Sequence, residues 1–200
     1  MTLQEKRNKM RRLIPASIAM LLIAPIPASA VAGPESSAAR IAAEREAMRK
    51  FSWMDGEWRG VAVTQTPAGE QRVTHTERVG STLDGSVRLI EGRSYRADGS
   101  TAFHALAMLS FDPDTRSYRL TSHAEGRYGS FPLVPTASGY SWEIASGPVT
   151  IRYTATFQDG VWTETGVRVV GAGSPTPFFR MELKRIGDSS WPEGGGVKPL

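Results

Sequence analysis

From residue 51 onward, apolar and polar residues alternate along the chain in runs of seven to eleven. A period of two is typical of β-strands that bury one face and expose the other. Turn-forming residues separate the runs, as at Asp98-Gly99 and Asp159-Gly160. The pattern predicts ten strands, over residues 56–66, 71–80, 86–96, 101–111, 116–124, 127–134, 139–145, 148–157, 161–170 and 177–186.

The links between consecutive predicted strands are short, so each strand is expected to form a hairpin with the next. A meander of ten strands avoids exposed edges most simply by closing on itself. We therefore predict an all-β fold: a single antiparallel up-and-down barrel of about ten strands within residues 51–188. An open sandwich is the alternative.

The two ends of the chain differ from this pattern. Residues 34–50 combine an early proline, a serine that can cap a helix and many strong helix formers, which predicts a short N-terminal helix within residues 31–50. Residues 189–200 contain three consecutive glycines and two prolines, so we expect a disordered tail. Trp191 is the residue of this tail that we expect to dock on the barrel.

The first thirty residues are typical of a secretory signal. Five basic residues precede the apolar run 13–24. This run contains about a dozen residues, whereas a membrane-spanning helix needs roughly 20, so no stable membrane anchor is expected. The small residues Ala28-Ser29-Ala30 predict cleavage after Ala30. We therefore expect residues 1–30 to be a signal peptide and the mature protein to be periplasmic or secreted.

Loss of the signal peptide changes the charge of the protein. The whole chain has 24 basic and 20 acidic residues, and residues 1–30 hold five of the basic residues and one of the acidic ones, which leaves 19 of each. A neutral chain without a basic patch argues against nucleic acid as a partner. The chain has no cysteine, so the fold must be stable without disulfides.

A short motif suggests the kind of barrel. Residues 51–60 lead from the predicted helix into the first strand and contain Gly-x-Trp-x-Gly at 56–60. This motif resembles the opening of calycin-like barrels, which include the lipocalins, the fatty-acid-binding proteins and the nitrobindin-like haem proteins. The chain looks most similar to small secreted bacterial proteins of uncharacterised function with such a barrel.

The resemblance implies a structural role for Trp58. In calycin-like barrels this tryptophan plugs one end and packs against a cation from the last strand. Arg180 is the candidate for that cation, with Lys184 and Arg185 as alternatives. The nitrobindin-like proteins hold haem by a histidine late in the chain, whereas the last histidine here is His123. We therefore expect neither haem nor any other cofactor.

The interior of a barrel of this size can hold one small ligand or be filled by side chains. We expect the protein to bind a small hydrophobic ligand in an interior cavity, without a catalytic role. The candidates to line this cavity are Phe103, Met108, Trp142, Tyr153, His104 and Glu91.

Other functions remain as alternatives. A barrel hydrolase or isomerase would use His75, His104 and Glu91, and it requires these side chains to converge inside the barrel. A filled barrel would act through its outer surface on another envelope protein, and it predicts a solid interior and an exposed apolar patch. The three histidines lie on three different predicted strands, and their alternation places at most two of them inside. We therefore expect no metal site.

Overall fold

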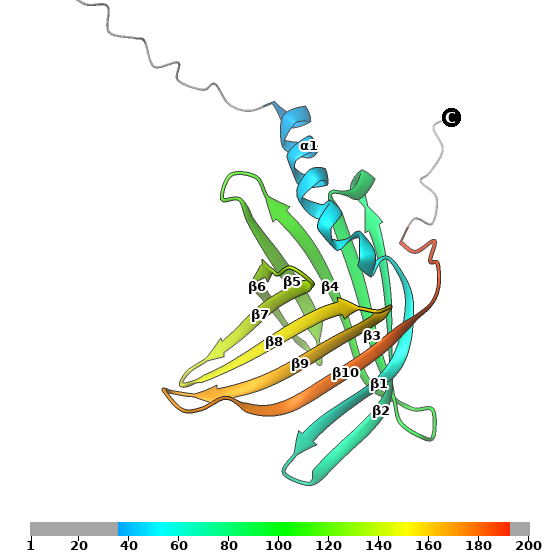
Figure 1. Cartoon of the computed structure of the whole chain (residues 1–200), viewed down its shortest axis with the longest axis vertical. Coiled ribbons are helices and arrows are strands. Elements are labelled where there is room, and N and C mark those ends of the chain that lie inside the picture. Colours follow the sequence, from blue (N-terminus) through cyan, green and yellow to red (C-terminus); the bar gives the residue numbers. More distant parts are fainter. Residues whose placement is uncertain (1–35, 193–200) are drawn as a thin grey trace, which may run out of the picture. The chain divides into compact units, whose positions relative to one another are not determined.

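The computed structural model describes residues 36–192, which form a helical segment followed by a β-sheet unit (Figure 1). The predicted signal peptide and residues 193–200 of the predicted tail lie outside the described residues. No helix in the described part of the chain is long and apolar enough to cross a membrane.

The helical segment consists of the α-helix α1 (Ser37–Met48) and the 3-10 helix η1 (Arg49–Met54). Ser36 has an extended backbone, and its hydroxyl accepts a hydrogen bond from the Ala39 amide at 3.2 Å. This hydroxyl satisfies one of the amide groups that are left free at the start of a helix. The expected N-terminal helix is therefore present and begins at Ser37.

Ten strands follow, and each is antiparallel to the next. They are β1 (Gly56–Thr66), β2 (Gly69–Thr82), β3 (Val87–Tyr95), β4 (Thr101–Asp112), β5 (Ser117–Ala124), β6 (Arg127–Pro135), β7 (Gly139–Ser146), β8 (Val149–Gln158), β9 (Val161–Val170) and β10 (Thr176–Gly187). A second 3-10 turn, η2 (Leu83–Gly85), joins β2 to β3.

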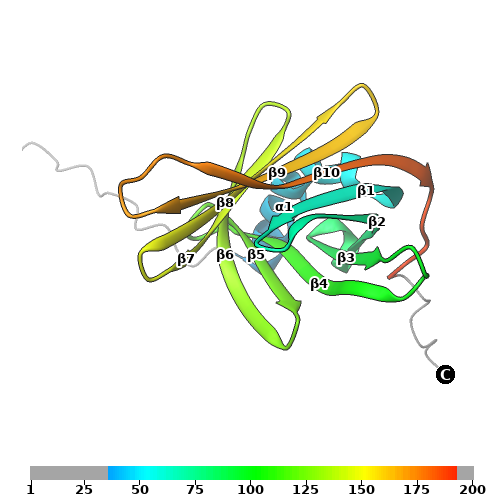
Figure 2. The ribbon, with the colours of Figure 1, turned by 90° about the horizontal axis from the view of Figure 1, so that it is seen from below.

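The sheet closes into a barrel because β1 pairs with β10 as well as with β2. Figure 2 shows the strands around the barrel, with α1 behind them. The predicted all-β fold, its ten strands and its up-and-down order are confirmed, and no strand boundary lies more than two residues from its predicted position. The sandwich alternative is wrong, since the sheet has no open edge.

The seam between β1 and β10 requires a glycine. Val61 pairs with Glu182, and Gly60 pairs with Leu183. A β-carbon on Gly60 would lie 1.9 Å from the carbonyl oxygen of Glu182, which is well inside van der Waals contact. Gly60, the last residue of the Gly-x-Trp-x-Gly motif, thus permits the close approach of the two strands that closes the barrel.

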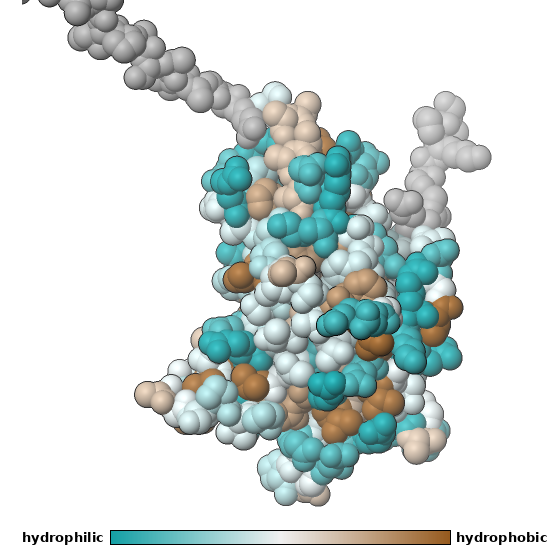
Figure 3. Space-filling model, in the orientation of Figure 1, coloured by the Kyte–Doolittle hydropathy of each residue, from teal (hydrophilic) through white to brown (hydrophobic). Residues whose placement is uncertain are grey.

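Side chains alternate between the interior and the outer face along each strand, as the pattern predicts. In β10, for example, Met181 and Leu183 are buried, whereas Glu182 and Lys184 are exposed. On the face shown in Figure 3, hydrophobic side chains form small groups among hydrophilic ones.

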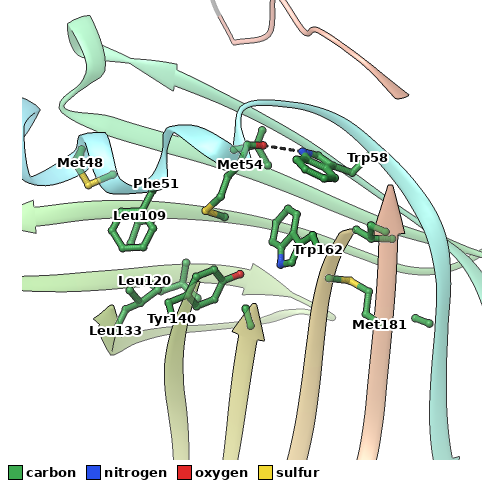
Figure 4. Packing of buried hydrophobic residues seen from close by; sticks show 14 residues of the cluster. Met48, Phe51, Met54, Trp58, Leu109, Leu120, Leu133, Tyr140, Trp162 and Met181 are labelled. Carbon is green, nitrogen blue, oxygen red and sulfur yellow. Dashed lines mark hydrogen bonds between the residues drawn. The ribbon is translucent and has the colours of Figure 1, made fainter. Parts of the chain in front are cut away.

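A dense core fills the end of the barrel next to α1. Met48 and Phe51 from the helical segment pack against side chains from the strands (Figure 4). Trp58 is 1 % exposed, and its indole Nε1 donates a 2.8 Å hydrogen bond to the Met54 carbonyl. Its ring meets that of Trp162 edge to face, at 5.6 Å between centroids. Trp58 therefore lies in the plugged end of the barrel.

Arg180, the cation that the resemblance implied, does not reach this end of the barrel. Of its alternatives on β10, Arg185 does, since its Nε donates a 3.2 Å hydrogen bond to the Asp55 carbonyl. Arg180 lies on the outer face of β10, where it pairs with Glu182 and its side chain is 57 % exposed. Residues of opposite parity along a strand face opposite sides, and the buried residues of β10 are Met181 and Leu183. Within residues 36–192 the buried cation is Arg88 of β3, whose side chain is 5 % exposed.

Arg88 fastens the helical segment to the barrel wall. Its guanidinium donates two hydrogen bonds to the Asp55 carboxylate, at 2.8 and 3.1 Å. A third, at 2.6 Å, goes to the Met48 carbonyl at the end of α1. Charge-assisted bidentate bonds of this kind are among the stronger hydrogen bonds in proteins.

The described part of the tail packs on the outer face of β2. Trp191 is half-buried, and the Arg78 guanidinium lies 4.8 Å from the centre of its ring. A β-carbon on Gly80 would lie 1.8 Å from the Trp191 carbonyl oxygen, so Gly80 leaves room for the tail backbone.

Replacing Arg88 should destabilise the barrel. Arg88→Met removes the bonds to Asp55 and leaves the Met48 carbonyl without its donor, so the free energy of unfolding should fall by roughly 2–3 kcal/mol. Urea unfolding of purified protein measures this change. The matched control, Arg180→Met, removes an exposed ion pair and should change stability by about 0.5 kcal/mol or less. An equal loss in both variants would contradict the assignment of Arg88 as the buried anchor.

Candidate functional site

A cavity of about 410 Å³ occupies the barrel interior beyond the aromatic core. Its floor includes Met54 and Trp162 of that core. It extends to Thr64 and Gln71 near the β1–β2 turn and to Phe178 near the β9–β10 loop, which lie toward the end of the strands away from α1. Its volume is within the range of about 300–1,000 Å³ that is common for small-molecule sites.

The cavity exists because two adjacent strands carry small inward-facing side chains. β3 contributes Gly92 and Ser94, and β4 contributes Ala105 and Ala107. Gly92 lies directly opposite Ala105 in the sheet. Large side chains fill the space at the α1 end, but these small ones cannot reach the barrel axis.

Aromatic side chains form much of the remaining wall. Trp142 on β7 and Tyr153 on β8 are cross-strand neighbours and stack with their ring centroids 4.5 Å apart. Tyr153 also meets Phe178 and Phe179 edge to face, at 6.0 and 5.9 Å. Phe103 faces the cavity from β4. This wall favours an apolar ligand.

The polar side of the cavity begins with a chain of hydrogen bonds on β2 and β3. The Nδ1 atom of His75 lies 2.7 Å from the Ser94 hydroxyl, and its Nε2 atom lies 3.0 Å from Glu77 Oε1. The His75 side chain is 6 % exposed and that of Glu77 12 %. His75 therefore has a partner at each ring nitrogen, and it holds Glu77 in place.

A second carboxylate, Glu164 of β9, also faces the cavity. The Tyr140 hydroxyl donates a 3.1 Å hydrogen bond to Glu164 Oε2. Burial, together with the negative charge of Glu77, raises the pKa of Glu164 from 4.5 to about 7. Burial and the charge of Glu164 likewise raise the pKa of Tyr153 to about 12. Glu164 therefore changes its protonation state near neutral pH, while Tyr153 keeps its proton.

Two buried polar atoms in the cavity wall lack a hydrogen-bond partner among the described residues: Glu77 Oε2 and Trp162 Nε1. Figure 4 shows the Trp162 nitrogen pointing away from Trp58, between Tyr140 and Met181. Buried polar atoms are seldom left unpaired in folded proteins. One acceptor and one donor are thus available to a molecule in the cavity.

Of the six predicted cavity residues, Phe103, Trp142 and Tyr153 line the cavity. Met108 and His104 lie on the outer face of β4 and are exposed, and Glu91 lies on the outer face of β3. Adjacent residues of a strand face opposite sides, so Phe103 and His104 could not both face the cavity. Glu164 and Glu77 are the site residues missing from the prediction, and the signal for Glu164 is that it shares a strand face with Trp162.

Glu91 and His104 do lie together, but outside the barrel. The two are 3.0 Å apart, and Glu91 also pairs with Arg93, at 2.8 Å, and with Arg78. Although partial burial opposes it, hydrogen bonds from Arg93, His104 and Arg78 lower the pKa of Glu91 to about 2. His75 is inside, so the three residues of the hydrolase or isomerase alternative do not converge.

The described residues contain no group of three or more His, Cys, Asp or Glu side chains that could hold a metal ion. His104 and His123 are on the outer face, with His123 stacked on Tyr128 at 5.7 Å. The interior histidine, His75, is hydrogen-bonded at both nitrogens. The histidines present therefore do not fit the axial ligation of haem.

Comparison with known proteins supports the fold. No protein-family model matches the chain, and no curated protein matches it. Among solved structures, the crystal structure of Rv2717c from M. tuberculosis is similar, with a TM-score of 0.53 and 12 % sequence identity. The alignment covers 70 % of this chain and 97 % of that one. At this identity the similarity extends to the fold alone.

The raised pKa of Glu164 predicts a specific dependence of stability on pH. Between pH 4.5 and about 7 the folded protein retains a proton that the unfolded chain has released, so stability should fall as pH rises through this interval. A rise of the pKa from 4.5 to about 7 corresponds to roughly 3 kcal/mol. Glu164→Gln should remove this part of the pH dependence, as measured by urea unfolding at about pH 5 and about pH 8.

Glu182→Gln is the matched control for that experiment. Glu182 lies on the outer face of the neighbouring strand and is 51 % exposed, so its replacement should leave the pH dependence of stability unchanged. The explanation is wrong if Glu164→Gln and the wild-type protein lose the same stability between the two pH values.

Proposed function

We propose that the protein is an exported, calycin-like barrel that binds a small hydrophobic molecule in its interior cavity. The observation that carries this proposal is the cavity of about 410 Å³ with Phe103, Trp142, Tyr153 and Phe178 in its wall. Burial of apolar ligand surface against such a wall provides the affinity, and a few polar groups orient the ligand.

Three features support a relation to the calycins. The barrel is closed and up-and-down, the Gly-x-Trp-x-Gly motif lies at the start of β1, and Trp58 of that motif is buried at the end covered by the helical segment. This arrangement blocks one end of the barrel and directs ligand exchange to the other.

A filled barrel that acts through its outer surface is less well supported. It predicts a solid interior, whereas the small side chains of β3 and β4 leave a cavity. Leu106, Met108 and Tyr128 are exposed on the outer face of β4 and β6, but nothing in the described part of the chain indicates what would cover them.

A second candidate function is proton transfer to or from a bound molecule. It is favoured by Glu164, whose pKa of about 7 suits a general acid or base. His75 and Glu77 could assist from the same cavity. Incubation of the protein with the molecule that copurifies distinguishes the two functions, because a binding protein returns this molecule unchanged, whereas a catalyst converts it.

Filling the cavity should abolish ligand binding. Ala105→Phe places a large ring in the cavity from β4, so the ligand should no longer bind. Leu106→Phe is the matched control, because its side chain is next in sequence but lies on the outer face at 45 % exposure. Native mass spectrometry of protein purified from its own host should show a ligand with the wild type and with Leu106→Phe, but not with Ala105→Phe. Absence of bound mass from all three, together with no response of tryptophan fluorescence to apolar probes, would contradict the proposal.

The proposed export has its own test. The mature protein should begin at Val31, and its intact mass in the envelope or the medium should lack residues 1–30. Ala30→Arg should block this cleavage, because signal peptidase requires a small residue next to the cut. Recovery of the uncleaved chain from the cytoplasm as the main form would contradict this location.

A further inference from the structure

The charges of the cavity are unbalanced. Glu77 and Glu164 both line it, from strands β2 and β9. They are close enough for the negative charge of Glu77 to raise the pKa of Glu164. No lysine or arginine of the described residues lines the cavity, and its one histidine, His75, already has a partner at each ring nitrogen. The cavity therefore has negative groups without a matching cation.

The hydrogen bonds of these carboxylates are also incomplete. Glu77 Oε2 is buried and has no donor among the described residues, although Glu77 Oε1 is bound to His75. Trp162 is 2 % exposed, lines the same cavity and has an unpaired indole nitrogen. A buried carboxylate oxygen without a donor costs about 1–3 kcal/mol or more. A ligand that donates hydrogen bonds would remove this cost.

Aromatic groups surround the second carboxylate. Tyr140 donates a hydrogen bond to Glu164, and the nearby indole of Trp142 lowers the pKa of Glu164. Tyr153, stacked on Trp142, is close enough for its pKa to respond to the charge of Glu164. Carboxylates combined with aromatic faces are the groups by which proteins recognise ammonium ions.

We propose that the ligand is a small apolar molecule with a protonated amine, whose ammonium group lies between Glu77 and Glu164. This inference rests on the proposed function and specifies its ligand class. The ammonium donates to Glu77 Oε2 and to Glu164, and the apolar part extends along Trp142 and Tyr153 toward Phe178. A hydroxyl next to the amine, or a water molecule, can accept from the Trp162 indole.

A carboxylic acid is a poor match for the same cavity, because its negative charge would face two carboxylates with no cation to offset the repulsion. A neutral alcohol can donate one hydrogen bond but gains no charge interaction. The three ligand classes thus differ in their head groups alone, so probes with one common chain can separate them.

Octylamine, octanol and octanoate are suitable probes, with tryptophan fluorescence of the wild-type protein as the readout, since Trp142 and Trp162 line the cavity. Octylamine should bind more tightly than octanol, on the order of tenfold or more, and octanoate should bind most weakly. Affinity for octylamine should also rise from about pH 6 to about pH 8, because Glu164 loses its proton in this range while the amine keeps its own.

The other titratable groups that face Glu164 do not reverse the expected rise in affinity for octylamine with pH. They are Tyr140 on β7, Tyr153 on β8, and Glu77 with His75 on β2, while β10 presents Met181. Both tyrosines have raised pKa values and stay protonated.

Substitutions test whether the two carboxylates cause the preference for octylamine over octanol. Glu77→Gln with Glu164→Gln keeps the size of both side chains and should bring the affinity for octylamine down to about that for octanol. Glu143→Gln with Glu182→Gln, both on the outer face, is the matched control and should keep the preference for the amine. Circular dichroism checks that each double variant is folded, and the wild-type panel decides the ligand class even if one is not.

Each result is decisive. Equal binding of octanol and octylamine to the wild type would overturn the amine inference but leave the proposed function standing. An amine preference that survives the interior double variant in folded form would also overturn it. Binding of none of the probes, with no copurified molecule, would contradict the proposed function and the amine inference together.

Discussion

The pairing of β1 with β10 removes the two free edges that a ten-stranded meander would otherwise expose. This pairing depends on how closely the two backbones approach, and Gly60 has no side chain where a β-carbon would lie 1.9 Å from the Glu182 carbonyl oxygen. Once the sheet is closed, every strand has one face turned inward. The interior is then defined by ten rows of alternating side chains, and their sizes determine what the barrel can contain.

These sizes are unevenly distributed along the barrel. Next to α1, the rings of Trp53, Trp58 and Trp162 pack edge to face and fill the available space. Farther along, the small residues of β3 and β4 leave the cavity. The helical segment covers the filled end only, because the hydrogen bonds between Arg88 and Asp55 hold it there. The end of the barrel next to α1 therefore holds the packed core that stabilises the fold. The cavity lies toward the other end.

The strands could be predicted because a period of two, interrupted by turn residues, leaves few alternatives. Which face of each strand points inward was harder to predict. In β4 both faces carry apolar residues: Phe103 and Leu109 point inward, and Leu106 and Met108 point outward. Hydrophobicity alone therefore does not identify the inward face of this strand. His104 and Met108 were assigned to the wrong side for this reason. Glu91 was misassigned in the same way, because it shares the outer face of β3 with Leu89.

The roles of Arg88 and Glu164 depend on contacts between strands that are distant in sequence. Arg88 meets Asp55 across 33 positions, and Tyr140 meets Glu164 across 24. A charged residue within an alternating strand is usually exposed, so the sequence pattern favours an outward position for both. The shared face of Trp162 and Glu164 is the signal that could have indicated otherwise.

The polar groups of the cavity work against the stability of the empty barrel. Enclosing Glu77 and Glu164 together raises the free energy of the folded state at neutral pH, where water would solvate both carboxylates in the unfolded chain. A barrel selected only for stability would have apolar residues at these positions, since a well-packed apolar replacement for buried charge is often neutral or stabilising. The dense core and the Arg88 anchor supply stability elsewhere and so allow this cost. Local conflict of this kind is expected where a protein contacts a ligand, and it is the physical reason to place the function inside the barrel rather than on its outer face.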